Sequence, residues 1–281
     1  MPTTIISELQ SKIMLNLMYI TNRPEIAEIL QRSGVDRVFI DLETIGKAER
    51  QGGMDTVQSK HSISDISLVR PHFNREILVR SNPIHKNSKD EINAIIENGA
   101  DVVMLPFFKS VNEAAKFIDI VGGRAKINLL VETVKAVEHI DAILELDGID
   151  EIHVGLNDLH LDYGMKFMFE LLTNGTVEEI SKKVLNKNIK FGFGGIARLG
   201  EGAIPAERII KEHYRIGSSI AILSRSFCNV DKIKELEKIE ETFVNGIKQI
   251  RILEKEAQNH LAYFRNNQME VIEAVEKIVS H

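Results

Sequence analysis

The sequence predicts a (β/α)8 barrel, an α/β fold in which eight parallel strands alternate with helices, with additional helices at its C-terminal end. Apolar runs of strand length occur eight times, helix-like segments separate most of them, and 281 residues suffice for such a barrel. A doubly wound open sheet is the alternative, but it has fewer strands and a glycine-rich loop after the first one. Here that loop reads Thr21, Asn22, Arg23, without glycine, which favours the barrel.

The predicted strands are apolar runs, most of them bounded by Gly, Pro, Asn or Ser. They are expected at residues 13–20, 36–43, 76–80, 101–105, 125–132, 149–159, 189–196 and 217–223. The helices between them are expected at residues 24–33, 88–98, from 110 onward, 133–147, 165–188 with an interruption at 174–175, and 205–214. Pro24 suits a first helical turn, Gly34 a helix stop, and Ser110 with Glu113 the spacing of a capping box.

The chain becomes charged and helical in pattern from residue 231 onward. Apolar residues recur there every seven positions, namely Leu236, Phe243, Ile250, Ala257 and Phe264. We therefore expect a barrel catalytic domain over residues 1–230 and a helical extension over residues 231–281. The extension packs either on the barrel itself or on a neighbouring subunit, and the sequence leaves both open.

Composition excludes several classes of partner. The formal net charge is -6 and no basic stripe is present, which argues against nucleic-acid binding. No apolar run approaches the roughly 18 residues that cross a bilayer, and residues 1–8 lack the features of a signal peptide. The single cysteine, Cys228, excludes an intramolecular disulfide and fits a reducing compartment. We expect a cytoplasmic protein without a nucleic-acid or membrane partner.

Charged residues gather at the predicted C-terminal ends of the strands, where barrels hold their active sites. They are Asp41, Glu43, Arg80, Glu132 and Asp158. Glu132 and Asp158 each end an apolar run, and the two runs are neighbouring parallel strands, so both carboxylates should offer oxygen ligands to a hard divalent metal. A structural ion pair between Arg80 and a carboxylate is the alternative, because an unpaired buried charge costs several kcal/mol.

Motifs along the barrel resemble those of the HpcH/HpaI aldolase and citrate lyase beta-subunit family. They are NGADVVMLP at 98–106 with EAA at 113–115, LVET at 130–133, and VGLNDL at 154–159. The resemblance extends over about residues 13 to 225, most of the barrel. It implies a barrel of the phosphoenolpyruvate/pyruvate superfamily that uses Mg²⁺ or Mn²⁺.

The resemblance also implies roles for single residues. Glu132 and Asp158 match the metal ligands of the family. Arg80 matches the arginine that contacts the oxo oxygen of the substrate, and Glu43 matches an acidic position that acts near the metal through water. The implied reaction cleaves a small 2-oxo acid between carbons 3 and 4. The metal and Arg80 together would stabilise the resulting pyruvate enolate.

Further substrate contacts are expected from Gly155 and Asn157, which lie in the motif around Asp158. Another is expected from Arg198, in the glycine-rich segment 191–202 after the seventh strand, where many barrels bind an anion. The alternative for this segment is a tight loop whose glycines supply positive φ angles. The apolar segment 165–169 either lines a substrate pocket or belongs to the core, and the core is favoured.

One position departs from the family pattern. Aldolases of this family place a histidine after the acidic residue of the second strand, where it helps to activate the general base, and here that position is Thr44. Segments 41–43 and 47–50 favour the citrate-lyase-beta branch, which cleaves acyl thioesters, yet that branch carries an acidic residue where Thr44 stands. As a replacement base we predict His160, two residues after Asp158, with His85 as second choice. The other histidines carry no such signal; they are His61, His72, His139, His153, His213, His260 and His281.

The leading hypothesis is therefore a divalent-metal-dependent carbon–carbon lyase of the class II aldolase type, acting on a 2-oxo acid. A citrate-lyase-beta-like lyase or hydrolase of acyl-CoA or carrier thioesters is the first alternative. A barrel that binds metal and ligand without turnover is the second. We expect a homo-oligomer, either a dimer, a trimer or a hexamer.

Overall fold

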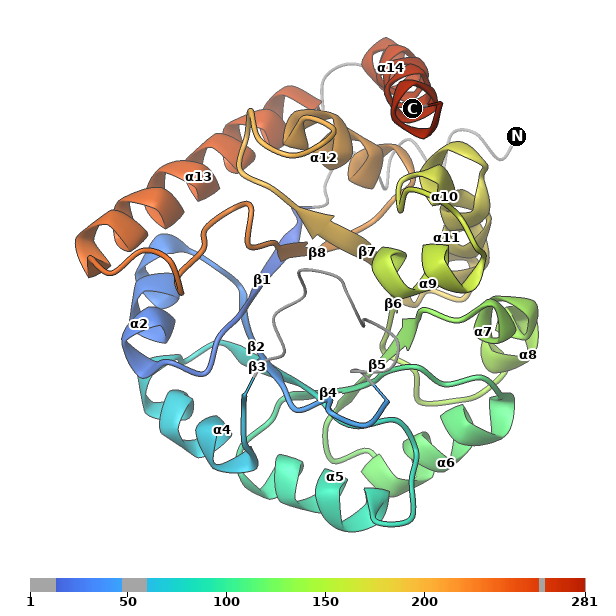
Figure 1. The fold of residues 1–281 in the computed structure, drawn as a ribbon. Coiled ribbons are helices and arrows are strands. Elements are labelled where there is room, and N and C mark those ends of the chain that lie inside the picture. The colour runs from blue at the N-terminus through green and yellow to red at the C-terminus, as the bar shows by residue number, and fades with distance from the viewer. Residues whose placement is uncertain (1–13, 47–59, 258–260, 281) are drawn as a thin grey trace.

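The computed structural model describes residues 14–46, 60–257 and 261–280 and confirms the (β/α)8 barrel (Figure 1). Eight strands, all parallel, close into a ring in chain order, with β1 pairing both β2 and β8. The strands are β1 (Asn16–Ile20), β2 (Arg37–Asp41), β3 (Glu76–Arg80), β4 (Val102–Leu105), β5 (Lys126–Val131), β6 (Glu151–Val154), β7 (Lys190–Ile196) and β8 (Ile220–Leu223).

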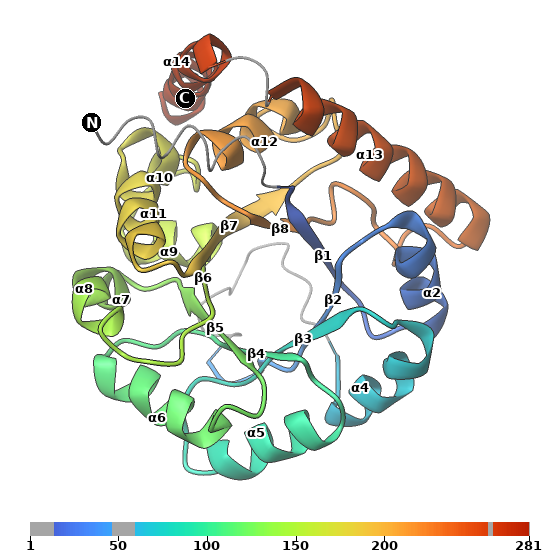
Figure 2. The ribbon, with the colours of Figure 1, turned by 180° about the vertical axis from the view of Figure 1, so that it is seen from behind.

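Helices surround the ring, as the views from its two ends show (Figures 1 and 2). Between the strands lie α2 (Pro24–Ser33), α4 (Ile63–Val69), the 3-10 helix η1 (Arg70–His72), α5 (Ser88–Glu97), α6 (Val111–Val121), α7 (Val134–Glu138), α8 (Ile140–Ile143), α9 (Leu156–Asp162), α10 (Glu170–Thr173), α11 (Thr176–Asn186) and α12 (Ala206–Arg215). After β8 come α13 (Leu236–Ala257) and α14 (Leu261–Val279). None of the helices in the described ranges is long and apolar enough to cross a membrane.

Local signals in the sequence correctly locate several helix ends. Helix α2 begins at Pro24, and Gly34, at φ +84°, ends it by donating its N–H to the carbonyl of Leu30. The Ser110 hydroxyl accepts the N–H of Glu113 at 3.3 Å and donates to the Glu113 carboxylate at 2.9 Å. The predicted N-cap of α6 is therefore confirmed.

Two predicted elements differ from the structure. The helix expected at 133–147 is two short helices, α7 and α8. The strand expected at 149–159 ends at Val154, and residues 156–162 form α9. The apolar residues at 156 and 159 have helical spacing, but they directly continue the apolar sequence of the strand. The hydrophobic pattern therefore does not show where the strand ends, and Gly155 marks that boundary.

The C-terminal helices lie against the barrel of their own chain (Figure 1). Helix α13 packs on α2, and α14 packs on α12 and α10. The heptad positions Phe243 and Ile250 are buried, and the Phe243 ring meets the Tyr19 ring edge-on at 4.9 Å. Asn267 of α14 donates one hydrogen bond to the Glu212 carboxylate at 2.9 Å. Phe243 and Ile250 of the heptad series thus pack within their own chain, whereas Leu236 is 38% exposed.

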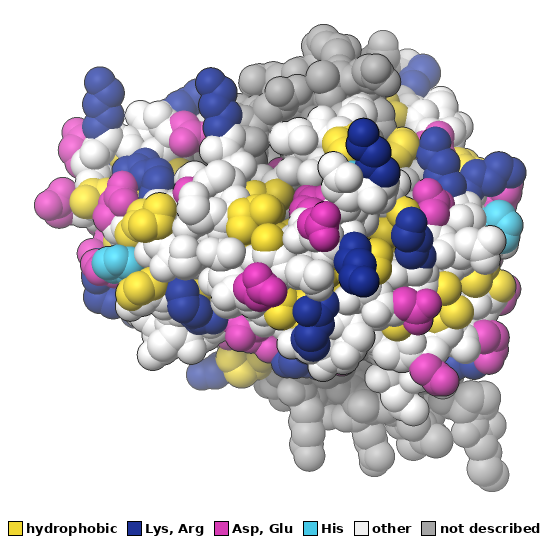
Figure 3. Space-filling model, turned by 90° about the horizontal axis from the view of Figure 1, so that it is seen from below, with side chains coloured by type: hydrophobic (Ala, Val, Ile, Leu, Met, Phe, Trp, Pro, Cys, Tyr) yellow, Lys and Arg dark blue, Asp and Glu magenta, His cyan; other side chains and the backbone are white. Residues whose placement is uncertain are grey.

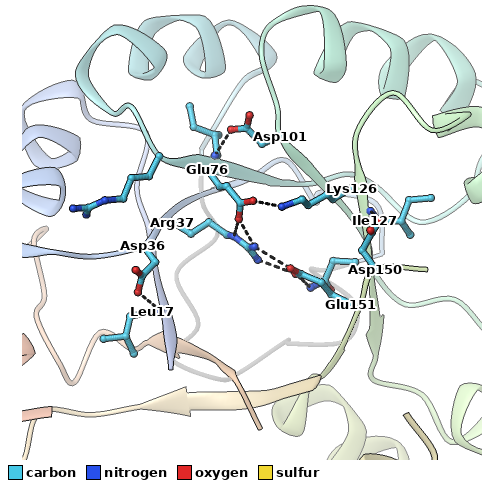
Figure 4. A network of polar contacts seen from close by, with 12 residues as sticks. Leu17, Asp36, Arg37, Glu76, Asp101, Lys126, Ile127, Asp150 and Glu151 are labelled. Carbon is cyan, nitrogen blue, oxygen red and sulfur yellow. Dashed lines mark hydrogen bonds and ion pairs between the residues drawn. The ribbon is translucent and has the colours of Figure 1, made fainter. Parts of the chain in front are cut away.

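The barrel interior is filled in layers that differ in chemistry. At the N-terminal ends of the strands, the guanidinium of Arg37 is fully buried among carboxylates (Figure 4). It bridges Glu151 at 2.8 and 2.9 Å and Glu76 at 2.5 Å, and Lys126 contacts Glu76 from the other side at 2.5 Å. Above this network lies an apolar layer made by Met18, Phe39, Leu78, Val102, Met104, Leu130 and Ile220.

His153 belongs to this interior and occupies space that a glycine leaves. A Cβ at Gly192, its register partner on β7, would lie 2.6 Å from His153 Nδ1. Burial lowers the pKa of His153 to about 4, against a weaker opposing effect of its hydrogen bond to the Gly194 carbonyl. The ring is therefore neutral near pH 7 and serves as a packed part of the barrel.

Charges are mixed on the outer surface. On the face drawn in Figure 3, acidic and basic side chains are interspersed, and neither sign forms a continuous stretch. Most exposed ion pairs bridge neighbouring turns or helices, as between Lys183 and Asp141 at 2.7 Å. Such pairs contribute little to stability individually.

Candidate active site

A cavity of about 940 Å³ opens at the C-terminal ends of the strands. Every strand of the barrel contributes to its lining, because the ends of all eight meet there. Its floor is mainly apolar and is made by Ile20, Phe39, Met104, Leu130, Ile222 and the neutral His153. Charged side chains also line the cavity, among them Asp41, Arg80, Glu132 and Asp158, which lie at or after the ends of β2, β3, β5 and β6.

Glu132 and Asp158 both line this cavity, and both are buried, with 2% and 8% of their surface exposed. Glu132 follows β5, and its Oε1 accepts the N–H of Phe107 at 2.9 Å. Phe107 has a φ of +48°, a left-handed conformation unusual for a residue with a side chain. The backbone after β4 is thus shaped so that a main-chain donor orients one carboxylate oxygen of Glu132.

Asp158 reaches the cavity from a different element than predicted. The prediction that it ends a strand is wrong, because it lies in the first turn of α9. A carboxylate in a first helical turn interacts favourably with the positive end of the helix dipole. The two carboxylates therefore share the cavity, one from a strand end and one from a helix start.

Gly155 lies against Glu132, precedes Asp158 by three residues and lines the same cavity. A Cβ at this position would lie 2.7 Å from Glu132 Oε2 and 2.9 Å from Glu132 Cβ. Only glycine lets the chain pass this close to the Glu132 side chain. The role of Gly155 in the structure is thus to make room for Glu132. Asn157, the other predicted substrate contact of this motif, is exposed at the cavity rim.

Arg80 both forms an ion pair and lines the cavity. Its Nε and Nη2 donate to the two oxygens of Asp41 at 2.8 Å each, and its Nη1 lies 3.4 Å from Glu43 Oε2. Burial opposes the charge of Arg80, but the charges and hydrogen bonds of Asp41, then Glu43 and Glu132, outweigh it and raise the pKa of the guanidinium. A guanidinium has five N–H donors, so Arg80 can hold Asp41 and contact a ligand together.

Glu43 and Thr44 follow β2 and are not among the described residues that line the cavity. Glu43 is 2% exposed and donates its N–H to Asp41 at 3.2 Å. Because Glu43 lies 3.4 Å from Arg80, its carboxylate stabilises the charge of that arginine. The exposed Thr44 donates its N–H to Asn82 Oδ1 at 2.9 Å. Residues 47–50, which suggested a thioester-cleaving branch, lie outside the described residues.

Like Glu43, the predicted site residues His160 and Arg198 do not line the cavity. His160 is buried inside α9, its Nδ1 faces the Leu156 carbonyl at 3.1 Å, and it is not a lining residue. The structure therefore does not bring His160 to the cavity, because helix α9 buries this side chain. Arg198 is 45% exposed, pairs with Glu201 at 3.2 Å, and is also absent from the lining. The predicted substrate contact of Arg198 is therefore not supported, although Gly194, Gly195 and Gly202 of the same segment line the cavity.

His61 lines the cavity, although no pattern in the sequence predicted a role for it. Its Nδ1 accepts the N–H of Asp41 at 3.0 Å, so a neutral His61 carries its proton on Nε2. It lies 20 residues after Asp41, just before α4, so no local pattern connects it to the strand end. His85, the second choice for a base, instead contacts Glu91 at 2.7 Å.

The carboxylate oxygens of Glu132 and Asp158 suit a hard divalent cation whose remaining ligands come from water or substrate. Within the described ranges, no group of three or more His, Cys, Asp or Glu side chains is arranged to hold a metal ion alone. Mg²⁺ and Mn²⁺ suit carboxylate oxygens, and Mg²⁺ is commonly held by one or two carboxylates together with water and substrate oxygens. Glu132 and Asp158 supply two such carboxylates, and a Cβ at Gly155 would lie 2.7 Å from Glu132 Oε2, so only the glycine backbone approaches this oxygen from that side.

Fold and site together define a (β/α)8 barrel of enzyme type, with carboxylates and an arginine around a cavity at the strand ends. The family model for HpcH/HpaI aldolase/citrate lyase matches residues 15–170. The chain belongs to this family, whose members are generally lyases of the phosphoenolpyruvate/pyruvate superfamily. The family predicted from the motifs is thereby confirmed.

Solved structures of similar fold include members of the same family. An HpcH/HpaI aldolase from Desulfitobacterium hafniense DCB-2 has a TM-score of 0.59 at 17% identity, with 86% of this chain and 93% of that chain covered. A family protein from Burkholderia cenocepacia J2315 has a TM-score of 0.61 at 13% identity, with 84% and 98% covered. The citrate synthase SbnG has a TM-score of 0.57 at 16% identity, with 76% and 88% covered. At these identities the likeness concerns the fold, and no curated protein matched the sequence.

Proposed function

We propose that the protein is a divalent-metal-dependent carbon–carbon lyase that cleaves a 4-hydroxy-2-oxo acid through a pyruvate-like enolate. The observation that carries this proposal is that Glu132, Asp158 and Arg80 line one cavity. Glu132 and Asp158 would hold Mg²⁺ or Mn²⁺. The bound metal would act as a Lewis acid toward the carboxylate and keto oxygens of the substrate.

Arg80 is suited to stabilise the negative charge that develops on the keto oxygen. Asp41 accepts hydrogen bonds from two of its nitrogen atoms, so the guanidinium is oriented and charged before the substrate binds. A donor fixed in advance stabilises an oxyanion better than a mobile one, because little reorganisation is needed during the reaction. Asp41 is in this scheme a positioning residue for Arg80.

His61 is suited to the other end of the breaking bond. Since its Nδ1 accepts the Asp41 amide, a neutral ring presents an N–H at Nε2. Such a group donates a hydrogen bond to the oxygen at carbon 4, which becomes the aldehyde oxygen on cleavage. His61 thus replaces His160 as the histidine assigned to the site, acting as a donor.

Asp158→Asn tests the metal site. Oxalate resembles the pyruvate enolate, so we expect calorimetric titration to show oxalate binding that requires Mg²⁺ or Mn²⁺ and is lost in this variant. Asp231→Asn is a matched control, because Asp231 lines the same cavity on the side of β8. Binding that needs no metal, or that survives in Asp158→Asn, would exclude the proposed site.

Gly155→Ala tests the close packing against Glu132. The added methyl group would force the Glu132 side chain to move, so we expect metal affinity to fall about 10- to 100-fold while the fold persists. Gly195→Ala is the control, since a Cβ there meets its neighbours at an ordinary 3.5 Å. Metal titration of both variants, with circular dichroism for folding, gives the comparison. Equal affinities in the two variants would contradict this role of Gly155.

The homo-oligomer and the cytoplasmic location stay predictions from the sequence. Both fit the proposed activity on a small 2-oxo acid. The charge of the exposed residues, mixed on the face of Figure 3, also suits a protein that acts on small molecules.

A further inference from the structure

One side of the cavity is apolar and extends away from the carboxylates. We call it the apolar annex and define it by six lining residues, Leu156, Met168, Phe169, Ile204, Ala206 and Ile209. They come from the start of α9, the segment before α10, the connection from β7 to α12, and α12 itself. These elements follow two consecutive strands, β6 and β7, so the annex occupies one sector of the mouth.

The residues of the annex are held in place by the surrounding fold. Leu156 is 2% exposed and lies over Gly194, where a Cβ would stand 2.7 Å from Leu156 Cδ1. Phe169 is 5% exposed, and its ring meets the Phe167 ring edge-on at 5.3 Å. Ile204 and Ile209 are each 2% exposed. Buried side chains that still line a cavity form a preorganised apolar surface, which favours an apolar ligand.

The annex begins next to the proposed metal ligands. Leu156 and Asp158 lie in the same first turn of α9, and Gly155 before them contacts Glu132. A cavity of about 940 Å³ is large enough for a drug-sized molecule, far more than the three-carbon pyruvate half needs. The remaining volume is therefore available to the other half of the substrate, attached at carbon 4.

The connections after β1, β2 and β8 offer a different chemistry. Arg23, Lys60 and Arg225 line the cavity there and would suit an acidic group. Arg23 already bonds Glu25 at 2.8 Å and the Val230 carbonyl at 3.2 Å, and Lys60 and Arg225 are exposed to solvent. Exposed charges contribute less to binding than buried apolar contacts do, so the annex is the stronger determinant.

We propose that the aldehyde half of the substrate carries an unbranched or aromatic apolar side chain, which binds in the apolar annex. This inference rests on the proposed function. In the cleavage, the bond between carbons 3 and 4 breaks and its electron pair forms the pyruvate enolate, which takes a proton at carbon 3. The hydroxyl at carbon 4 loses its proton and becomes the carbonyl of the apolar aldehyde. Atoms and charge balance without a further reactant.

The test is the reverse reaction, the addition of pyruvate to straight-chain aldehydes from acetaldehyde to hexanal. We expect kcat/KM to rise about fourfold per methylene group until the annex is full. Met168→Gln should flatten this series, lowering kcat/KM for hexanal at least tenfold while acetaldehyde changes little. Met165→Gln is the matched control, because Met165 is partly buried in the same segment but does not line the cavity.

A second measurement separates this inference from the proposed function. Exchange of the pyruvate methyl protons for deuterium in heavy water, followed by NMR, reports enolate formation without any aldehyde. Absence of metal-dependent exchange overturns the proposed function and this inference with it. Exchange together with a flat chain-length series, or with a preference for succinic semialdehyde over hexanal, overturns the apolar annex alone.

Discussion

Arg80→Lys is expected to lower kcat by about 100- to 1,000-fold with a small effect on the thermal midpoint. Lysine keeps the positive charge between Asp41 and Glu43, but it cannot hold both oxygens of Asp41 as the guanidinium does at 2.8 Å. The fixed donor at the developing oxyanion is lost, and removing one such donor typically costs this much in kcat. Steady-state kinetics with a 4-hydroxy-2-oxo acid, or the rate of pyruvate proton exchange, measures the effect.

Two further variants serve as comparisons for Arg80→Lys. Arg80→Ala should be equally inactive but also less stable, because it leaves the buried Asp41 and Glu43 without their shared cation. Arg198→Lys should behave as wild type, since Arg198 is exposed and pairs with Glu201 outside the cavity. Near wild-type turnover in Arg80→Lys would end the role assigned to Arg80.

Arg37→Ala is expected to destabilise the fold by about 3–5 kcal/mol. The change removes the cation that bridges Glu151 and Glu76 at the closed end of the barrel, and leaves the fully buried Glu151 carboxylate uncompensated (Figure 4). Denaturant unfolding followed by circular dichroism measures the loss. Lys135→Ala, which breaks the exposed pair with Glu138, should have a far smaller effect.

The same network predicts a dependence of stability on pH. Burial works against the charged form of Glu76, but the charge and hydrogen bonds of Arg37 and Lys126 outweigh it and lower its pKa from 4.5 to about 2. A carboxyl group whose pKa is lower in the folded state than in the unfolded state stabilises the fold at pH values above its unfolded pKa. This stabilisation is lost as the pH falls toward the pKa of the folded state. Stability from Glu76 should therefore disappear between about pH 4.5 and pH 2. An Arg37→Ala protein whose stability falls as steeply with acid as that of the wild type would contradict this assignment.

Much of the candidate site follows from where strands end. The strand at Glu76–Arg80 has the predicted bounds, and Arg80 and Glu132 come directly from strand ends to the cavity. The alternation of strands and helices determines which end of each strand faces the cavity. The sequence alone therefore predicts that side chains from distant strand ends lie together there. The placement of Asp158 succeeded for a different reason than expected, because a helix, not a strand, carries it.

The sequence by itself determined the barrel, the family and the group of acidic residues with Arg80, because these depend on local periodicity, short motifs and strand ends. Only the tertiary structure decided which side chains face the cavity. The start of α9 at Leu156 turns His160 inward, and the approach of the chain before α4 brings His61 beside Asp41. The apolar annex likewise depends on Phe169 and Ile204 lining the same cavity, although they lie in separate connections of the chain. Such contacts join segments that are distant in the chain, and hydrophobic patterns within one segment carry no information about its partner.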